Sequence, residues 1–226
     1  MHPAGRQHIL DALAIAAYHA QTDIPIVRLL IADDAPQFQT ITQELALCWI
    51  HEGRHYKKLM PTLLYHQQLQ HKFLSSFWRY YERLKRYRES PSPDLAAQLS
   101  HHFDRLFAIR TGYAALDKLI ARTQAHKTAL LRVLHHPEIE LHNNPAELAA
   151  RRRVRKRHIS FAPNSERGLQ AWDTFMSLAG TTHLLGISFF HYLRDRLMQH
   201  GAIAPLPTLI QQLADELNLA QSWQPA

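Results

Sequence analysis

The sequence predicts an α/β fold that is mostly helical. Two short apolar runs near the start are typical of buried parallel strands, and long later stretches place apolar residues every three or four positions, as amphipathic helices do. Glycine contributes 7 of the 226 residues, which argues against a turn-rich all-β protein. At roughly 150 residues per domain, this length allows one large domain or two small ones.

The first fifty residues are predicted to alternate between helix and strand. Residues 8–20 follow one helical face, and Ile26–Ala32 is an apolar, partly β-branched run that predicts a buried strand of a parallel sheet. A short helix is expected over Phe38–Glu44, and a second buried strand over Leu45–Ile50. This order is typical of an α/β layer.

The middle of the chain is predicted to form an antiparallel helical hairpin. Apolar residues at helical spacing predict a long helix over Thr62–Arg88. Ser92 is suited to cap a second helical stretch over Asp94–His135, with a possible break at residues 111–112. Pro137 ends that stretch, because proline cannot continue a helix.

The last third of the chain is also predicted to be helical. Asn144 is a suitable N-cap, and Glu147 stands three residues later, as in a capping box. Further helices are expected over Leu169–Leu185, Ser188–His200 and Pro207–Leu219.

Composition favours a cytoplasmic protein with an acidic partner. The formal net charge is +7, and nucleic acid is the first candidate for such a basic chain. Cys48 is the single cysteine, so no intrachain disulfide can form, and this fits a reducing compartment. No apolar stretch approaches the ~20 residues of a membrane span, so we expect no membrane association.

Two carboxylates follow the first predicted strand. Asp33 and Asp34 stand where active sites form in α/β proteins, at the carboxyl end of a parallel strand. A polar strand terminus or a cap for the next segment would explain the same two residues, and the sequence leaves these alternatives open.

A run of basic residues follows Glu147. Charge runs are usually solvated helix faces, but a face of one sign repels itself unless it meets an anion, and the phosphate backbone is the natural one. We therefore predict nucleic-acid binding by six residues: Arg151, Arg152, Arg153, Arg155, Lys156 and Arg157.

One further pattern matches a zinc-peptidase motif. His51, Glu52 and His55 have the H-E-x-x-H spacing, which places two imidazoles on one helical face beside a carboxylate. The pattern is weak here, because a third ligand is needed and Gly53 disfavours a helix interior. A zinc metallopeptidase is therefore a remote alternative.

Several segments together resemble bacterial insertion-sequence transposases of the IS-sixty-six type. The resemblance begins with Leu30–Phe38, which looks like the strand of the family's second aspartate, and with Cys48–Leu59, which looks like its Cys-Trp-x-His-x-x-Arg segment. It continues through Leu141–Glu147 and three later segments, in family order. Those later segments are Arg153–Phe161, Ala171–Phe175 and Leu185–Leu193.

The resemblance implies a ribonuclease-H-like fold with an Asp-Asp-Glu triad and Mg²⁺. It implies Asp33 as the second aspartate, with Asp34 as the fallback, and Glu147 as the final glutamate. Both Asp33 and Glu147 would then be metal ligands, which suits Mg²⁺ because it prefers oxygen donors. The implied activity is DNA transposition by phosphodiester cleavage and transfer, and the implied partners are the transposon ends and target DNA.

The chain departs from the family pattern at the first aspartate. Asp11 lies in a helical pattern and Asp23 in a turn, and neither ends a strand. We therefore expect an N-terminally truncated copy, a split frame or a misplaced start, with an incomplete ribonuclease-H-like domain that is inactive alone. The alternative is a non-catalytic, transposase-derived DNA-binding or regulatory protein that forms a homo-oligomer or pairs with the full-length enzyme.

Four segments and a cellular location follow from this interpretation. A partial ribonuclease-H-like α/β core would occupy residues 1–60, and a helical insertion residues 61–137. The C-terminal catalytic helix region would occupy residues 138–200, and a helix and tail residues 201–226. The protein would lie in the bacterial cytoplasm, associated with the nucleoid.

Overall fold

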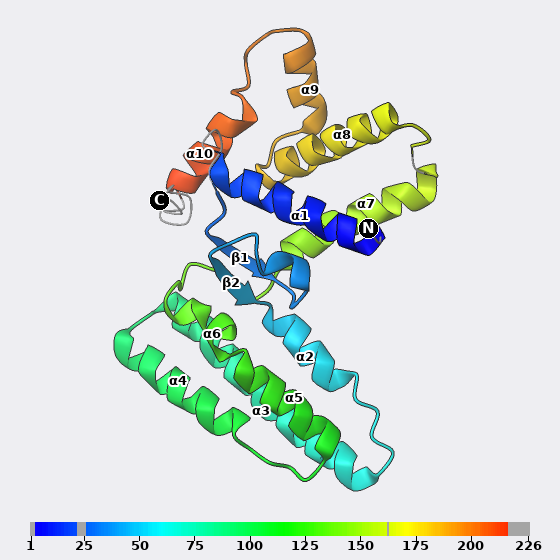
Figure 1. The fold of residues 1–226 in the computed structure, drawn as a ribbon. Coiled ribbons are helices and arrows are strands. Elements are labelled where there is room, and N and C mark those ends of the chain that lie inside the picture. The colour runs from blue at the N-terminus through cyan, green and yellow to red at the C-terminus, as the bar shows by residue number, and fades with distance from the viewer. Residues whose placement is uncertain (1–2, 22–25, 162, 217–226) are drawn as a thin grey trace. The chain divides into compact units, whose positions relative to one another are not determined.

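The computed structural model describes residues 3–21, 26–161 and 163–216. The chain divides into two compact units with a boundary between Asn143 and Asn144, called here unit 1 and unit 2. Helices dominate both units, and the described strands form one two-stranded sheet in unit 1 (Figure 1). The predicted mostly helical character is therefore confirmed.

Unit 1 opens with a helix and a parallel strand pair. Helix α1 spans Pro3–Ala20, strand β1 Leu29–Ala32 and strand β2 Glu44–Leu47. The strands pair in parallel from Leu29 opposite Glu44 to Ala32 opposite Leu47. Because the strands are parallel, their carboxyl ends lie at the same edge of the sheet, and this edge carries Asp33 and Asp34.

Both strands are shorter than the sequence predicts, and the connection between them differs. The helix expected over residues 38–44 is wrong: a 3₁₀ turn, η1, spans Pro36–Phe38, and Glu44 already belongs to β2. The second strand ends at Leu47, and helix α2 spans Trp49–Lys57. An apolar run cannot by itself distinguish a buried strand from the buried start of a helix, which explains this error.

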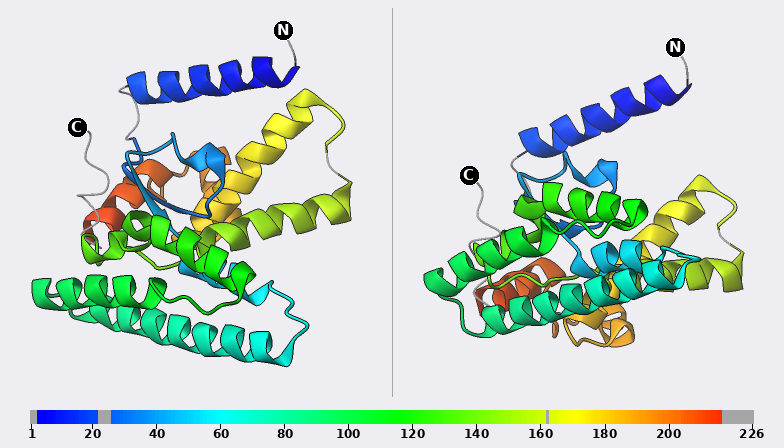
Figure 2. Two further views of the ribbon diagram at one scale, coloured as in Figure 1. Left: turned by 60° about the horizontal axis from the view of Figure 1, so that its bottom comes forward. Right: turned by 90° about the horizontal axis from the view of Figure 1, so that it is seen from below.

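Helices α3 to α6 form the body of unit 1. Helix α3 spans Leu64–Glu89, α4 Pro93–Phe107, α5 Ala114–Ala125 and α6 Lys127–Leu130, and a 3₁₀ turn, η2, covers Arg132–Leu134. Helices α3, α4 and α5 lie side by side in both views of the ribbon (Figures 1 and 2). The region is therefore a three-helix arrangement with a short fourth helix, and the predicted two-arm hairpin is too simple.

The break between α4 and α5 has a defined cause. The carboxylate of Asp117 accepts hydrogen bonds from the backbone and hydroxyl of Thr111, at 2.8 and 2.7 Å, and from the backbone of Gly112 at 3.1 Å. Gly112 has φ +82°, a left-handed conformation that glycine adopts without strain. The break predicted at residues 111–112 is confirmed, and the Ser92 cap is as well, because its hydroxyl accepts from the backbone of Leu95.

Trp49 is the centre of an aromatic core in unit 1. Its ring is fully buried, with ring centroids 5.4 Å from Phe77, 5.5 Å from Tyr80 and 6.3 Å from Phe103. Its indole Nε1 donates to the carbonyl of Leu130 at 2.9 Å. These contacts join α2 to α3, α4 and α6, so the first residue of α2 is part of the helical core.

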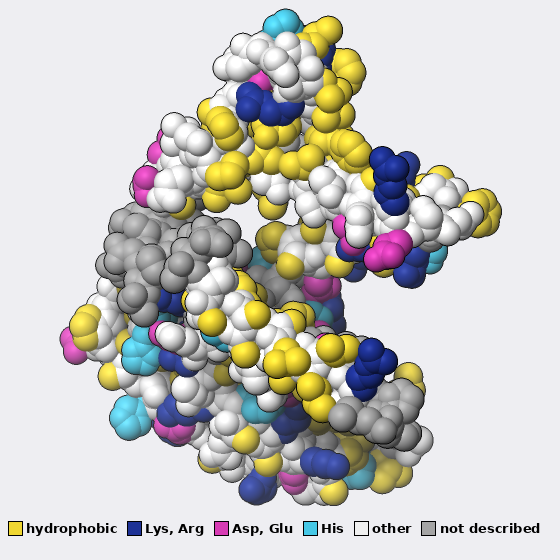
Figure 3. Space-filling model, turned by 45° about the horizontal axis from the view of Figure 1, so that its top comes forward, with side chains coloured by type: hydrophobic (Ala, Val, Ile, Leu, Met, Phe, Trp, Pro, Cys, Tyr) yellow, Lys and Arg dark blue, Asp and Glu magenta, His cyan; other side chains and the backbone are white. Residues whose placement is uncertain are grey.

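Unit 2 consists of four described helices. Helix α7 spans Asn144–Ser160, α8 Glu166–Leu184, α9 Phe189–Leu197 and α10 Leu206–Glu216. The buried carboxylate of Asp195 accepts from the backbone of Ala202 at 2.8 Å, which fixes the turn after α9. Hydrophobic side chains are exposed on the surface in the space-filling view, where they are yellow (Figure 3). On α8, α9 and the residue after α9, the exposed ones are Leu169, Phe175, Leu184, Phe190, Leu197 and Met198.

Among the described helices, none is long and apolar enough to cross a membrane. The predicted cellular location stays a prediction.

Candidate functional site

The two carboxylates at the end of β1 have different surroundings. Asp33 accepts one hydrogen bond from a described residue, from the backbone of Ala35 to Oδ1 at 3.3 Å. Asp34 Oδ2 lies 2.8 Å from a guanidinium nitrogen of Arg122 and 3.7 Å from His126 Nε2. At the end of β1, Asp34 is therefore paired with a cation, while Asp33 accepts a backbone hydrogen bond and is paired with no described cation.

Arg122 belongs to a polar cluster that links β1, α2 and α5. Its second guanidinium nitrogen lies 3.5 Å from a carboxylate oxygen of Glu52, whose side chain is 4% exposed. The hydroxyl of Thr123 donates to Glu52 and contacts the hydroxyl of Tyr56. Burial raises the pKa of Tyr56 well above its usual value, so this hydroxyl stays protonated. The sequence patterns did not reveal Arg122, because its partners lie 70 and 88 residues away.

The H-E-x-x-H residues do lie on one helix, α2, but they are engaged in other contacts. Glu52 faces Thr123 and Arg122, and the Nε2 atom of His51 accepts from Arg54 at 3.0 Å. Burial, together with the charge of Arg122, lowers the pKa of His55. Across the described part of the chain, no group of three or more histidine, cysteine or acidic side chains is arranged to hold a metal ion, so the zinc-peptidase alternative gains no support.

Gly53 interrupts the motif for a packing reason. A Cβ atom at this position would lie 2.5 Å from Cζ2 of Trp78 and 3.1 Å from Cε1 of Phe77. The missing side chain therefore allows α2 to approach α3 closely, although glycine is a poor residue for a helix interior.

Helix α7 carries Glu147 and the whole predicted basic run. Glu147 lies in its first turn, and all six basic side chains are exposed to solvent. Two of the six have partners on α8: Arg152 donates to His183 Nε2 at 2.9 Å, and Arg153 is paired with Asp173. For Arg151, Arg155, Lys156 and Arg157, no ion pair with another described residue is found. Most of the positive charge of α7 is therefore presented to solvent.

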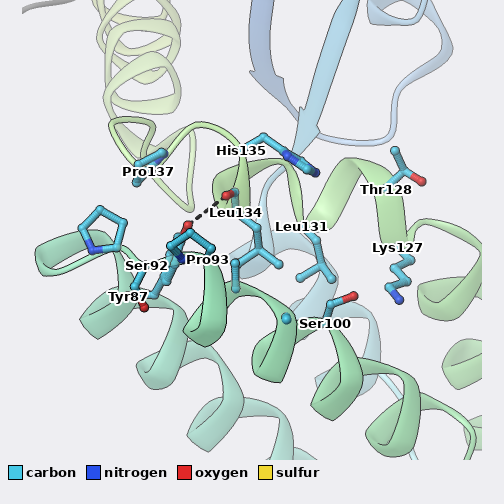
Figure 4. Close-up of a pocket in the computed structure, with 13 residues that line it drawn as sticks. Tyr87, Ser92, Pro93, Ser100, Lys127, Thr128, Leu131, Leu134, His135 and Pro137 are labelled. Carbon is cyan, nitrogen blue, oxygen red and sulfur yellow. Dashed lines mark hydrogen bonds between the residues drawn. The ribbon is translucent and has the colours of Figure 1, made fainter.

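Unit 1 also contains a cavity that is lined by none of the candidate site residues named above. It has a volume of about 900 Å³ and lies between the end of α3, the start of α4 and the α6–η2 segment (Figure 4). The hydroxyl of Tyr87 crosses it to donate to the carbonyl of Leu134 at 2.8 Å. Its walls are mostly apolar, with Lys127 and His135 as the titratable groups, so it lacks the carboxylates expected of a metal-dependent nuclease site.

Comparison with known proteins places this sequence in a family. Residues 27–171 match the model of the transposase IS66 family, and the chain belongs to that family. It is 43% identical over 183 residues to the uncharacterized protein y4jO of Sinorhizobium fredii (strain NBRC 101917 / NGR234). That match covers 80% of this chain and 56% of the relative, so the chain spans little more than half of the relative's length. No solved structure matches.

The two strand-end carboxylates differ in how well they fit a magnesium ion. Carboxylate oxygens are the ligands that Mg²⁺ prefers. Asp34 fits poorly, because the guanidinium of Arg122 lies 2.8 Å from it and already neutralises its charge. Asp33 fits better, because the hydrogen bond that it accepts from a described residue comes from a backbone amide and no described cation is paired with it.

Proposed function

We propose that this protein is a transposase-derived DNA-binding chain with part of a ribonuclease-H-like Asp-Asp-Glu site. The observation that carries the proposal is the family match over residues 27–171, which includes Asp33, Glu147 and the basic run of α7. Asp33 takes the role of the second aspartate and Glu147 that of the final glutamate.

Each group has a defined task in this proposal. Asp33 and Glu147 would each supply a carboxylate to Mg²⁺, and the ion would supply activation of the attacking hydroxyl and stabilisation of the leaving oxygen in phosphodiester transfer. Arg122 pairs with Asp34, so Asp34 would not serve as a metal ligand. The exposed cations of α7 hold DNA phosphates, which positions the strand and carries no sequence information.

Metal binding tests the site assignment without requiring activity. Mn²⁺ is added to the purified chain in place of Mg²⁺, and the bound ion is counted by electron paramagnetic resonance. We expect Asp33→Asn and Glu147→Gln each to weaken Mn²⁺ binding about tenfold or more, and Asp34→Asn, the matched control, to leave it nearly unchanged. Equal binding by the original chain and Asp33→Asn would contradict the assignment of Asp33.

A second candidate function is a non-catalytic DNA-binding regulator. It is favoured by the finding that the described residues hold no group of three or more acidic, histidine or cysteine side chains arranged for a metal. Its partner would be a second copy or a full-length transposase, with the exposed apolar side chains of α8 and α9 as the contact surface.

A strand-transfer assay separates the two candidates. The chain is mixed with DNA and Mg²⁺, alone and together with a full-length transposase of the family. A partial catalytic chain restores transfer to a full-length enzyme that carries substitutions at its own second aspartate and final glutamate. A regulator binds the same DNA and changes the rate of an intact enzyme, with no rescue of the substituted one.

A further inference from the structure

A groove with basic walls runs between α3 and α4 in unit 1. Two neighbouring hollows of about 470 and 580 Å³ follow it, and both are lined by Arg83 from α3 and Arg105 from α4. A third hollow of about 490 Å³ continues over α3 and is lined by Arg79, Arg83 and Arg86. The three hollows share Arg83, so they form one continuous surface, called here the α3–α4 groove.

The arginines of α3 form a stripe opposite the buried face of the helix. Arg79, Arg83 and Arg86 are separated by four and three residues, so they lie on one face, while Phe77, Tyr80, Leu84 and other apolar residues of the helix face the core. Like charges at this spacing destabilise a helix. This unfavourable arrangement is compensated when an anion lies along the stripe.

Helix α4 adds a cation, Arg105, and an exposed imidazole, His101, across the groove. His101 and Arg105 are exposed and four residues apart, and Arg83 donates to Nδ1 of His102. That bond fixes Arg83 at the centre of the groove. Burial, with the charges of Arg83 and Arg105, lowers the pKa of His102, so at neutral pH this imidazole accepts and adds no charge.

The acidic residues next to the groove are already neutralised. Glu82, which lines the hollow over α3, is bound by Lys85 at 3.0 Å. Asp104 is bound by Lys127 at 2.7 Å. Salt bridges from Arg79, Arg83, Arg86 or Arg105 to a carboxylate are absent among the described residues, so the positive charge of the groove is open to an external anion.

We propose that the α3–α4 groove is a second DNA-binding surface that holds the phosphate backbone of a duplex. The seven residue steps from Arg79 to Arg86 rise about 10 Å along the helix. Phosphates of one strand follow each other every 3.4 Å or so along the duplex axis, so the stripe spans about three of them. The cations are spread over two helices, which suits a polyanion better than a single phosphate ion.

This surface is distinct from the Asp33–Glu147 site and from the basic run of α7. It lies in the helical region that separates the two carboxylates in the sequence. Each surface would contact phosphates through its own cations, so the contribution of each to DNA binding can be measured with separate variants. The contact needs no metal, and it can be measured with a chelator present.

Salt-dependent binding of a 30-base-pair duplex of arbitrary sequence tests the proposal. The dissociation constant is measured by fluorescence anisotropy between 50 and 300 mM salt, with a chelator, for the full chain and for the variant Arg79→Gln/Arg105→Gln. Each phosphate contact contributes about −0.9 to the slope of log K against log salt, so we expect the slope to lose about 1.8 in magnitude. Affinity near 100 mM salt should fall by about tenfold or more.

The control variant removes the same charge elsewhere on unit 1. Lys58→Gln/Lys118→Gln replaces two exposed lysines that do not line the groove, and it should leave the slope within about 0.5 of the original. A second variant, Arg86→Gln/Arg105→Gln, should repeat the loss. Circular dichroism melting should show the same transition for all variants, because the replaced side chains are exposed.

The outcome is independent of the function proposed above. If both groove variants behave like the lysine control while Arg155→Gln/Arg157→Gln still weakens binding, the α3–α4 groove is not a DNA contact and the α7 surface stands. If the groove variants lose affinity and slope as expected, the second surface is supported whether or not Asp33 binds a metal.

Discussion

The carboxylate of Asp34 and the guanidinium of Arg122 lie 2.8 Å apart, across 88 residues of sequence. This pair joins the carboxyl end of β1 to α5, and Arg122 reaches on to the buried Glu52 of α2. One arginine therefore holds three elements together at the sheet edge where Asp33 stands. The same contact distinguishes the two neighbouring aspartates, because it neutralises Asp34.

Replacing Arg122 should destabilise unit 1. Arg122→Met leaves the carboxylate of Glu52 buried with Thr123 and without its cation. Because Arg122 is itself 29% exposed, we expect a loss of about 2 kcal/mol in the free energy of unfolding, below the 3–5 kcal/mol of a fully buried pair. Urea unfolding of the original chain and of Arg122→Met measures this loss.

A double substitution checks the cause of that loss. Adding Glu52→Gln to Arg122→Met should recover part of the stability, because it removes the buried charge of Glu52 that has lost its cation. Asp34→Asn, at a carboxylate that is 31% exposed, should cost less than about 1 kcal/mol. Additive losses from Arg122→Met and Glu52→Gln would contradict the inferred coupling.

Adding a methyl group at Gly53 should separate α2 from α3. The new Cβ would lie 2.5 Å from the Trp78 ring, so Gly53→Ala should lower the free energy of unfolding by about 1–3 kcal/mol. The matched control is Gly180→Ala on α8, where no atom lies within 4 Å of the new Cβ. That change should be neutral or raise stability by up to about 1 kcal/mol. Thermal melting that orders the two variants the other way would refute the packing role of Gly53.

Mild acid should weaken the fold through two histidines. Burial lowers the folded-state pKa of His55 and of His102 below the ordinary 6.5, assisted by Arg122 at the first and by Arg83 and Arg105 at the second. Below pH 6.5 the unfolded chain therefore binds more protons than the folded one. The stabilisation is complete above pH 6.5 and is lost as the pH falls toward the folded values.

Unfolding at pH 7.5 and pH 5.5 measures this dependence. The original chain should lose stability between the two values. The double variant His55→Gln/His102→Gln should lose less over the same interval, whatever its stability at pH 7.5. An equal or steeper loss in the variant would assign the pH dependence to other groups.

Removing the Asp117 carboxylate should loosen the α4–α5 connection. Asp117→Ala abolishes three hydrogen bonds, so we expect a loss of about 1–2 kcal/mol at pH 7. Thr111→Val removes one of the three and should cost less than about 1 kcal/mol. The rate of hydrogen exchange at the amides of Thr111 and Gly112 should rise in Asp117→Ala. Unchanged exchange there would contradict the role of the Asp117 carboxylate in fixing the turn between α4 and α5.

The same carboxylate should make the free energy of unfolding depend on pH in the acid range. Desolvation opposes the shift, but the hydrogen bonds from Thr111 and Gly112 lower the pKa of Asp117 below its ordinary 3.8. Its stabilisation is therefore present above pH 3.8 and is lost as the pH falls through the folded value. In Asp117→Ala, the free energy of unfolding should change less with pH in that acid range. Its change between pH 7.5 and pH 5.5, which is assigned to the histidines, should be the same as in the original chain.

Helical periodicity predicted most elements of this chain. The expected helix over residues 62–88 lies at 64–89, and the expected helix over residues 188–200 appears, shortened, at 189–197. One error lies where apolar residues run continuously, at the end of the second strand. Trp49 belongs to a helix and not to a strand, because its ring packs against aromatic side chains of α3 and α4 that lie more than 25 residues away.

The candidate site could be predicted only in part. Asp33, Asp34, Glu147 and the basic run were found from local sequence and from the family resemblance. The different surroundings of Asp33 and Asp34 could not be, because adjacent aspartates look alike in a sequence. The α3–α4 groove escaped notice for a similar reason, since its cations come from two helices and are mixed with acidic residues along the chain.

The sequence by itself determined the helical content, the parallel strand pair, the family and the basic character of α7. These features depend on local periodicity, composition and motif order, which the chain carries without reference to its fold. The tertiary structure decided which aspartate is paired with a cation, why a glycine stands inside α2, and which arginines lie together with no ion pair to a described carboxylate. Those are distances between residues far apart in the chain, and they exist only after the helices have packed.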